Sequence, residues 1–352
     1  MPNKVLLIRA DANAEIGTGH VMRCVGLAQA WRDSGGRVEF ILAPGGAEIY
    51  DRVLSEGFEV REVLAEIGSA GDAAQTAELC AGSAAEWLVL DGYHFSQDYR
   101  HRIRSAVPRL LLVDDHGEVA PYNCDIVLNT NVYATNAMYP DRKGRTRFLL
   151  GSRYALLRGE FSDVQSRFAE VPEQASRLLV TLGGADPNNV TLQVVEALQE
   201  LEDIEFELTV VLGASNSHRS SIERALKSFS RPAELLVNVR NMPELMARSD
   251  LAISAGGGTC DELAFFHVPM FLITIAKNQE LAVEAYCRNK AAVVAGWFTV
   301  LNRGVLAASL RKVMGDKNLR TQISAKAGEL VDGQGARRVV KSMHGVGAEA
   351  TR

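Results

Sequence analysis

The chain has 352 residues, 47% of them hydrophobic and 23% charged, and its formal net charge is −5 at pH 7. A chain of this length can bury a large core and is expected to fold as two domains. Its acidic balance argues against nucleic acid or an anionic membrane as the main partner, and no apolar run approaches the ~20 residues that a membrane-spanning helix needs. The five cysteines are odd in number and have no paired spacing, so we expect reduced thiols and no zinc site.

The first predicted strand, residues 5–8, precedes a helix whose apolar residues recur at helical spacing as far as Trp31. Because the strand begins so close to Met1, a secretory signal has no room and a cytoplasmic location is expected. Gly17-Thr18-Gly19-His20 lies between this strand and this helix. Backbone N–H groups at a helix start suit an anion, and histidine exchanges a proton near neutral pH. The loop is therefore predicted to hold an anion site and a base, the alternative for His20 being a helix cap or packing residue.

The first half of the chain alternates strands and helices. Further strands are predicted at 37–42, 58–63, 87–90, 109–113 and 125–128, and helices at 48–56, 72–81 and 97–105. Such alternation with near-continuous apolar strands predicts an α/β fold with a parallel, doubly wound sheet. Polar side chains follow several strands, at Asp11 and His20, at Asp91, Tyr93 and His94, at Asp114 and Asp115, and at Asn129 and Asn131. Ligands bind at that edge of such sheets, although each residue could instead cap a helix or turn.

Residues 132–176 interrupt the alternation. We expect an amino-terminal domain at 1–160, a connection at 161–176, a second domain at 177–344 and a tail at 345–352. In the second domain, strands are predicted at 178–182, 206–212, 235–239, 251–254 and 269–275, with helices at 191–201, 221–229, 242–248, 260–266 and 280–289. Three further helices, at 305–313, 320–331 and 337–342, are expected to close this domain. Two Rossmann-like, doubly wound lobes that face a cleft fit this plan best.

The second domain contains two glycine turns, Gly183-Gly184-Ala185-Asp186 and Gly256-Gly257-Gly258-Thr259, each between a strand and a helix. Bare backbone at such a turn can approach a diphosphate closely. Glu262 lies one turn into the following helix and is placed to accept hydrogen bonds from ribose hydroxyls, or to complement the helix dipole. Asn278 and Gln279 begin the next helix and are candidates to bind a sugar or to cap that helix.

Other known motifs fit less well. The opening loop lacks the third glycine of a dinucleotide-binding fingerprint, because position 22 is Met, although Glu39 could imitate the ribose-binding acid. The NAD interpretation is therefore disfavoured but stays open. The sequence contains neither a Gly-Lys-Ser/Thr phosphate loop nor the Gly-x-Ser-x-Gly elbow of many hydrolases.

Several motifs, in order over roughly positions 4 to 285, carry a family resemblance. They are Arg9-Ala10-Asp11, Ile16-Gly17-x-Gly19-His20-Val21-x-Arg23, Asp91-x-Tyr93, Asp114-Asp115, Tyr154-Ala155-Leu156-x-Arg158-x-Glu160-Phe161, Gly183-Gly184-x-Asp186-x-x-Asn189, the turn at 254–262 and Asn278-Gln279-Glu280. With these motifs the chain resembles the hydrolases that remove UDP from UDP-2,4-diacetamido-2,4,6-trideoxy-β-L-altropyranose in pseudaminic acid biosynthesis. Taken together, the motifs are far more specific than any one of them.

The resemblance implies a GT-B-like fold, related to the glycosyltransferase that makes the lipid-linked disaccharide of peptidoglycan. It implies that UDP binds mainly to the carboxyl-terminal lobe, and that His20 is the general base for water attacking the anomeric carbon with inversion. Asp11 or Tyr93 would orient the imidazole or the water, and neither a cofactor nor a metal is required. The substrate-binding residues implied are Arg9, Gly17, Gly19, Arg23, Tyr154, Gly183, Gly184, Asp186, Gly256, Gly257, Gly258, Thr259, Glu262, Asn278 and Gln279.

The expected partners are a UDP-sugar and water, without nucleic acid or membrane, and the oligomeric state is open, a monomer being one option. The glycine-rich tract after Ala255 and the Gly92-Tyr93-His94 sequence depart from the family pattern, so a different sugar could be preferred. Two other functions remain open, a GT-B glycosyltransferase in which His20 activates an acceptor hydroxyl, and a nucleotide-sugar-binding protein without turnover. For the hydrolase, the turn at 256–259 is the better diphosphate candidate, which leaves the opening loop mainly to activate water.

Overall fold

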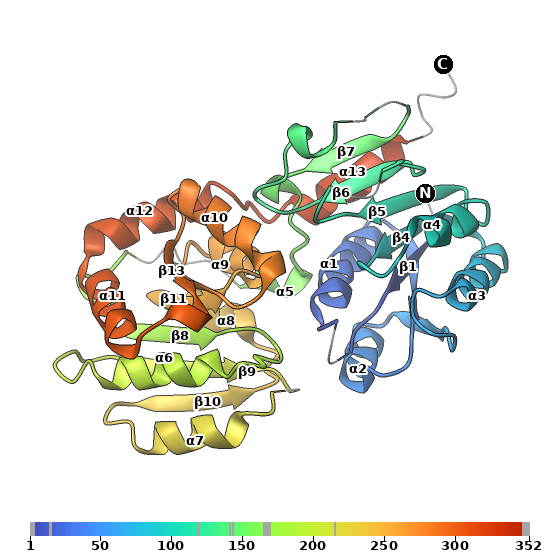
Figure 1. Cartoon of the computed structure of the whole chain (residues 1–352). Coiled ribbons are helices and arrows are strands. Elements are labelled where there is room, and N and C mark those ends of the chain that lie inside the picture. The colour runs from blue at the N-terminus through green and yellow to red at the C-terminus, as the bar shows by residue number, and fades with distance from the viewer. Residues whose placement is uncertain are drawn as a thin grey trace. The chain divides into compact units, whose positions relative to one another are not determined.

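The computed structural model describes residues 4–13, 16–117, 120–140, 142, 144–164, 170–214 and 216–346. Parts of the predicted connection (165–169) and of the predicted tail (347–352) lie outside these residues. The chain divides into two compact units (Figure 1), the first containing the described residues up to Gly159 and from Gly333 onward, the second running from Glu160 to Asp332.

The first unit is built on a sheet of seven parallel strands in the order β3-β2-β1-β4-β5-β6-β7. The strands are β1 (Val5–Ala10), β2 (Arg37–Leu42), β3 (Glu59–Glu62), β4 (Ala85–Asp91), β5 (Arg109–Val113), β6 (Ile126–Asn129) and β7 (Arg147–Leu150). The helices of this unit are α1 (Gly19–Asp33), α2 (Ala47–Ser55), α3 (Ala70–Ala81), α4 (Gln97–Arg104) and α13 (Gly335–Gly345), with short 3₁₀ turns at Asn136–Met138 and Ser152–Tyr154.

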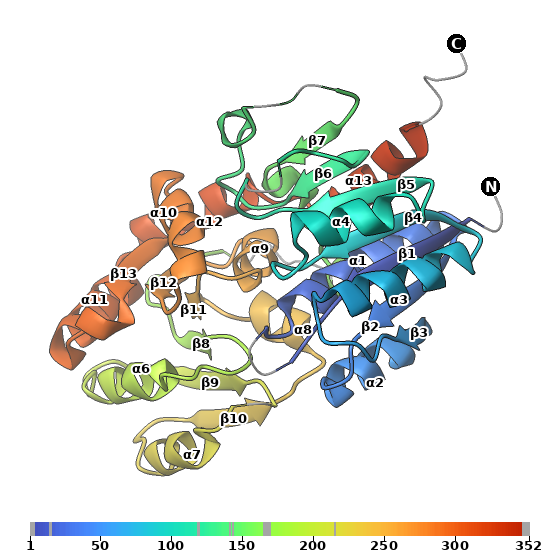
Figure 2. The ribbon, with the colours of Figure 1, turned by 45° about the vertical axis from the view of Figure 1, so that its right-hand side comes forward.

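Both faces of this sheet are covered, which explains why its strands are almost wholly apolar. Successive side chains of a strand point to opposite faces. Leu6 and Ile8 of β1 accordingly join a core with α1, α2 and α13, whereas Val5 and Leu7 join a second core with α3 and α4 (Figure 2). The sheet thus holds its loops rigidly at the two ends of the strands.

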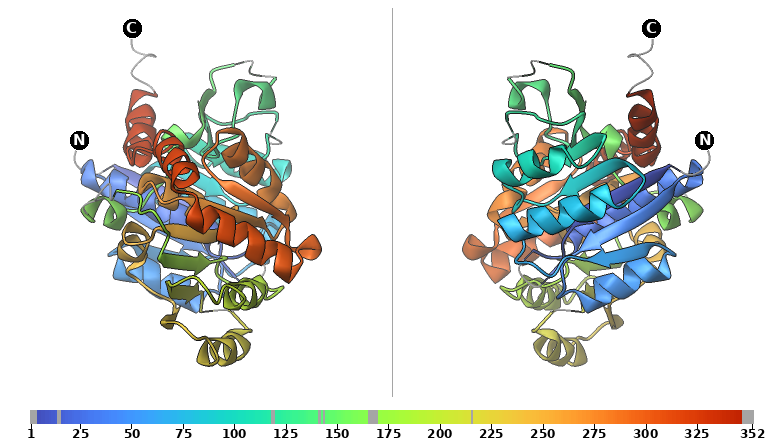
Figure 3. Two further views of the ribbon diagram at one scale, coloured as in Figure 1. Left: turned by 90° about the vertical axis from the view of Figure 1, so that its left-hand side faces the viewer. Right: turned by 90° about the vertical axis from the view of Figure 1, so that its right-hand side faces the viewer.

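Helix α13 lies in the first unit, not in the second domain where the sequence analysis placed it. Four of its buried side chains, Ala336, Val339, Val340 and Met343, pack into the core beside α1. The course of this helix can be followed in Figures 1 and 3. In addition, the rings of Trp31 and His344 stack at 4.9 Å. The helical spacing of its apolar residues predicts that one face is buried, but it does not reveal which domain buries it.

The second unit repeats the plan with six parallel strands in the order β10-β9-β8-β11-β12-β13. They are β8 (Arg177–Thr181), β9 (Glu207–Leu212), β10 (Ala233–Val237), β11 (Leu251–Ala255), β12 (Met270–Thr274) and β13 (Val293–Trp297). The helices are α5 (Gly159–Asp163), which begins at the division, α6 (Val190–Gln199), α7 (Arg219–Lys227), α8 (Met242–Ala247), α9 (Thr259–Phe265), α10 (Glu280–Arg288), α11 (Arg303–Gly315) and α12 (Lys317–Gly328), with 3₁₀ turns at Lys277–Gln279 and Phe298–Val300.

The α/β fold with two Rossmann-like sheets is confirmed, and two edge strands were missed. β7 has only four residues, and β13 contains Gly296 at φ +107° beside an irregularity in its pairing with β12. Short edge strands with glycine carry a weak sequence signal.

The strand order reverses between β1 and β4 in the first sheet, and between β8 and β11 in the second. In doubly wound folds, ligands bind outside the carboxyl ends of the strands at such reversals. A ligand-binding site is therefore expected at the reversal of each sheet. None of the helices in the described ranges is both long and apolar enough to cross a membrane.

Candidate active site

His20 and Asp91 form a pair at the strand reversal of the first unit. His20 is the second residue of α1, and Asp91 is the last residue of β4. Nδ1 of His20 lies 2.7 Å from Oδ1 of Asp91, and the two side chains are 9% and 0% exposed. When Nδ1–H of the neutral imidazole donates to this carboxylate, the lone pair is on Nε2, which can accept a proton. A carboxylate holds the histidine of a serine hydrolase in its base-competent tautomer in the same way.

Arg23, one turn further along α1, joins Asp91 to Asp115. Its Nε and Nη2 donate to Asp91 at 2.7 and 2.6 Å, and Nη1 and Nη2 donate to Asp115 at 3.0 Å each. Burial alone would raise the pKa of both carboxyl groups, but attraction to Arg23 outweighs it and both pKa values are lowered. Two carboxylates and one guanidinium leave one negative charge beside His20, and that charge is balanced when His20 takes a proton.

Tyr93 packs on the His20 ring. The two ring centroids are 4.8 Å apart with an edge-on geometry, and the hydroxyl of Tyr93 donates to Oδ2 of Asp115 at 2.8 Å. The side chain is 55% exposed overall. Desolvation near its hydroxyl and the adjacent Asp115 charge raise the pKa of Tyr93, so the hydroxyl remains a donor. Tyr93 thus contacts the His20 ring while about half of its own side chain is exposed to solvent.

The sequence suggested Asp11 as one residue that could orient the imidazole or the water, but its carboxylate is bonded to other groups. Its carboxylate accepts from Arg9 at 2.5 Å, from the Ala43 N–H at 2.8 Å and from Nε2 of His94 at 3.0 Å. Burial opposes this charge, but His94 and Arg9 lower the pKa of Asp11. The residue that orients the imidazole is Asp91, which the sequence analysis quoted in a motif without giving it a role.

Three residues predicted to bind substrate have side chains that form buried ion pairs, core packing or helix-capping hydrogen bonds. The side chain of Arg9 is fully buried and ion-paired with Asp11 and with Asp72. Tyr154 packs against the core of the first unit. Asp186, in the second unit, is buried and accepts the N–H groups of Val190 and Thr191 at the start of α6. Arg23, also predicted to bind substrate, directs all three nitrogens of its guanidinium to Asp91 and Asp115.

The glycines of the opening loop serve different purposes. Gly17 has φ +76°, a conformation that side chains rarely adopt, whereas Gly19 is exposed and begins α1 with open space where a Cβ would lie. Gly19 therefore leaves the backbone next to His20 accessible.

The candidate residues of the second unit lie at the carboxyl ends of three adjacent strands. Gly183, with φ +94°, and Gly184 follow β8, the turn Gly256–Thr259 follows β11, and Asn278 and Gln279 follow β12. Gly257 and Gly258 are exposed with open space at the Cβ position, so a ligand can approach their backbone. Gly256 is buried, and a Cβ there would lie 2.4 Å from Cγ2 of Val283. Its missing side chain is what lets the turn pack on α10.

The remaining predicted residues border this turn. Glu262 lies one turn into α9 and is half-buried. Asn278 is exposed, and Oε1 of Gln279 accepts from the N–H of Ile275 at 3.3 Å, which ties the start of α10 to the end of β12. Gln279 occupies the N-cap position of α10, but its side chain forms no capping hydrogen bond with that helix. The structure brings all of these residues to one edge of the second sheet.

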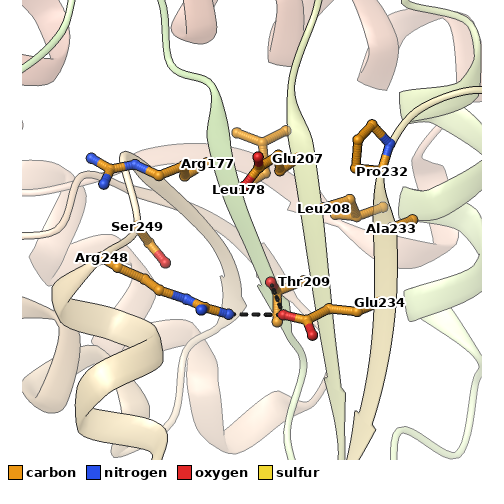
Figure 4. A pocket seen from close by; sticks show the side chains of 10 residues that line it. All are labelled: Arg177, Leu178, Glu207, Leu208, Thr209, Pro232, Ala233, Glu234, Arg248 and Ser249. Atoms are coloured by element: carbon orange, nitrogen blue, oxygen red, sulfur yellow. Dashed lines mark hydrogen bonds and ion pairs between the residues drawn. The ribbon is translucent and has the colours of Figure 1, made fainter.

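A cavity of about 390 Å³ lies at the opposite edge of the second sheet, at the amino ends of β8, β9 and β10 (Figure 4). Among its charged side chains, Arg248 donates to Glu234 at 2.8 Å, and Arg177 pairs at 2.5 Å with Asp250, which lies outside the cavity lining. Ligands of doubly wound sheets bind at the carboxyl ends, so we assign this cavity no role. Across the described residues, no group of three or more His, Cys, Asp or Glu side chains is arranged to hold a metal ion.

Comparison with known proteins agrees with this architecture. Residues 177–329 match the family described as glycosyltransferase family 28 C-terminal domain. MurG of Acinetobacter baumannii has a similar fold, with a TM-score of 0.68 and 14% identity over 97% of this chain and 99% of that one. The matched fold is that of GT-B glycosyltransferases.

Two curated relatives are similar in sequence over most of the chain. The UDP-2,4-diacetamido-2,4,6-trideoxy-β-L-altropyranose hydrolase of Campylobacter jejuni is 26% identical over 280 residues, covering 78% of this chain and 93% of that protein. The protein named uncharacterized protein MJ1062 of Methanocaldococcus jannaschii is 26% identical over 287 residues, or 80% of this chain, and the match spans 57% of its length. The chain is thus a GT-B-fold protein whose second unit carries the glycosyltransferase family 28 carboxyl-terminal match.

Proposed function

We propose that the protein hydrolyses a UDP-sugar at the anomeric carbon and releases UDP. The observation that carries this proposal is the His20–Asp91 pair at the strand reversal of the first unit. The similarity to the Campylobacter jejuni hydrolase supports UDP-2,4-diacetamido-2,4,6-trideoxy-β-L-altropyranose as the substrate. The free sugar would then serve pseudaminic acid biosynthesis.

In this reaction Nε2 of His20 removes a proton from water while the water oxygen attacks the anomeric carbon. The bond between that carbon and the β-phosphate oxygen breaks, its electron pair leaves with UDP, and the configuration at the carbon inverts. Asp91 holds Nδ1–H, and the excess negative charge of the Asp91–Arg23–Asp115 group stabilises the imidazolium as it forms. A positioned base of this kind contributes roughly 10²–10⁴-fold to the rate.

The second unit would bind the UDP portion. Open space beside Gly257 and Gly258 would let a diphosphate approach the backbone of this turn, and the carboxylate of Glu262, one turn into α9, would accept hydrogen bonds from the ribose hydroxyls. The match to a glycosyltransferase carboxyl-terminal domain over 177–329 supports this division of roles.

The same match favours one alternative, a glycosyltransferase in which His20 deprotonates an acceptor hydroxyl instead of water. The two activities differ when no acceptor is present, because only the hydrolase then releases UDP at its full rate. A binding protein without turnover would release none.

The test compares two variants in two assays, UDP release and UDP binding. His20→Leu should reduce release by roughly 10²–10⁴-fold and leave the dissociation constant for UDP unchanged, because it removes only the base. Glu262→Ala should weaken UDP binding while the protein remains folded. Equal loss of release and UDP binding in His20→Leu would give His20 a structural role, and an unchanged UDP affinity in Glu262→Ala would refute the ribose contact.

A further inference from the structure

The first unit contains two side-chain clusters of the same composition. In each, an arginine bridges two aspartates, a histidine contacts one aspartate, and a tyrosine hydroxyl donates to the other. The first cluster consists of His20, Asp91, Arg23, Asp115 and Tyr93. The second cluster consists of His94, Asp11, Arg9, Asp72 and Tyr99.

The two clusters connect the same two strand ends in opposite directions. His20, after β1, contacts Asp91 at the end of β4, and His94, after β4, contacts Asp11 just after β1. β1 and β4 are neighbours, and Ala10 pairs with Asp91 in their register. Both histidines are therefore held at the strand reversal where ligands of such sheets bind.

His94 differs from the rest of its cluster in being open to solvent. Its side chain is 20% exposed, more than that of His20, whereas Asp11 and Arg9 are 1% and 0% exposed. Asp11 also accepts hydrogen bonds from Arg9 and from the Ala43 N–H, so His94 is not its only hydrogen-bond partner. A partner for Asp11 alone does not require a histidine at an accessible position.

The orientation of the ring leaves one nitrogen for a ligand. Nε2 of His94 lies 3.0 Å from Oδ2 of Asp11, and the ring packs on Phe95 with centroids 4.0 Å apart. With the Nε2–H donating to Asp11, the lone pair of the neutral imidazole is on Nδ1. Within the ranges that the structure describes, no protein group is recorded as a hydrogen-bond partner of this nitrogen.

We propose that His94 is a second substrate-contacting residue, whose Nδ1 accepts a hydrogen bond from the sugar of the nucleotide sugar. The group recognised is an N–H or O–H substituent of the sugar ring, as in an acetamido or hydroxyl sugar. The inference rests on the proposed function only for the identity of the ligand, a UDP-sugar. His94 selects and holds the sugar, and His20 activates the water.

Two substitutions separate this role from a structural one. His94→Gln places an amide N–H where Nε2 lies and keeps a donor to Asp11, but it has no acceptor at the Nδ1 position. His94→Asn keeps an acceptor near the Nδ1 position and loses the contact with Asp11. Exposed His101 on α4 supplies the control variant His101→Gln.

Binding is measured by calorimetry in a His20→Leu background, with UDP and with UDP-2,4-diacetamido-2,4,6-trideoxy-β-L-altropyranose as separate probes. His94→Gln should bind the UDP-sugar roughly tenfold more weakly, the loss expected for one hydrogen bond, with unchanged UDP affinity and melting temperature. His94→Asn should lose less UDP-sugar affinity but melt earlier. Unchanged UDP-sugar affinity in His94→Gln, or an equal loss for UDP, would overturn the proposal. Because this assay needs no turnover, its outcome is independent of whether the unsubstituted protein releases UDP.

Discussion

Asp91→Asn tests the pairing on which the mechanism depends. In the native protein Asp91 accepts from His20 and from Arg23, at 2.7 and 2.6 Å on the same oxygen. An asparagine that keeps its carbonyl oxygen toward Nε of Arg23 would place its amide group at the Oδ1 position, facing His20. The amide N–H would then donate to Nδ1, which moves the imidazole proton to Nε2 and removes the base.

The expected loss follows from the contacts that disappear. A hydrogen bond to a charged group contributes about 1.5–3 kcal/mol, which corresponds to roughly 10- to 150-fold in rate. The wrong tautomer and the loss of the negative charge that balances the imidazolium add to this, so we expect kcat to fall roughly 10²–10⁴-fold. UDP affinity should not change, because Asp91 lies in the first unit.

The assay is steady-state UDP release, with the unfolding free energy measured in parallel. Breaking a buried ion pair costs about 3–5 kcal/mol, and Asp250→Asn supplies a matched control. Asp250 is also buried and pairs with the half-exposed Arg177, but it lies in the second unit, at the end of the sheet away from the glycine turns. Asp250→Asn should lose stability and keep kcat. A folded Asp91→Asn protein with kcat within a few-fold of the native value would refute the role given to Asp91.

Three further predictions concern stability. Gly256→Ala should lower the unfolding free energy by about 1–3 kcal/mol in urea titrations, because the added Cβ would lie 2.4 Å from Val283. Gly257→Ala is the control and should change the unfolding free energy little, because there is open space at its Cβ position. Equal effects of the two substitutions would contradict the packing of Gly256 on α10. Met343→Ala should lower the unfolding free energy of the first unit by about 2–5 kcal/mol, since this side chain is fully buried in the core of that unit. Hydrogen exchange that shows the destabilisation in the second unit would contradict the placement of α13 in the first. The pKa values of Asp11, Asp91 and Asp115 are lowered in the folded protein, so the unfolded chain binds protons more readily. The stability that they provide should be complete above about pH 4 and decline as the pH falls below it, and an unfolding free energy that stays constant down to about pH 3 would contradict this.

Much of the fold was predictable because its signals are local. The strand at 109–113 was predicted with the bounds of β5, and that at 37–42 with the bounds of β2, since uninterrupted apolar runs between turn residues indicate buried strands. The edge strands β7 and β13 were missed because they are short, and α13 was assigned to the wrong unit. Which surface an amphipathic helix covers depends on contacts distant in sequence, and local periodicity does not contain them.

The loops that carry the candidate site residues were predictable from the sequence, but the hydrogen-bond partners of these residues were not. The sequence indicated the positions of His20, Tyr93 and the glycine turns in the fold, because strand ends and helix starts can be recognised from it. The partner of His20 was not, because Asp11 is near in sequence whereas Asp91 is 71 positions away. Only the order of the strands, with β4 beside β1, makes Asp91 the nearer carboxylate. In the same way, the burial of Arg9 could not be inferred from its position in a motif.

The most direct test of the central claim is the fate of the oxygen atoms during UDP release. The purified protein is incubated in ¹⁸O-labelled water with UDP-2,4-diacetamido-2,4,6-trideoxy-β-L-altropyranose and no acceptor, and the UDP is analysed by mass spectrometry. Attack of water on the anomeric carbon predicts rapid release of UDP without ¹⁸O, and His20→Leu should abolish that release. UDP that carries ¹⁸O would place the attack at phosphorus, and no release of UDP would contradict hydrolysis altogether.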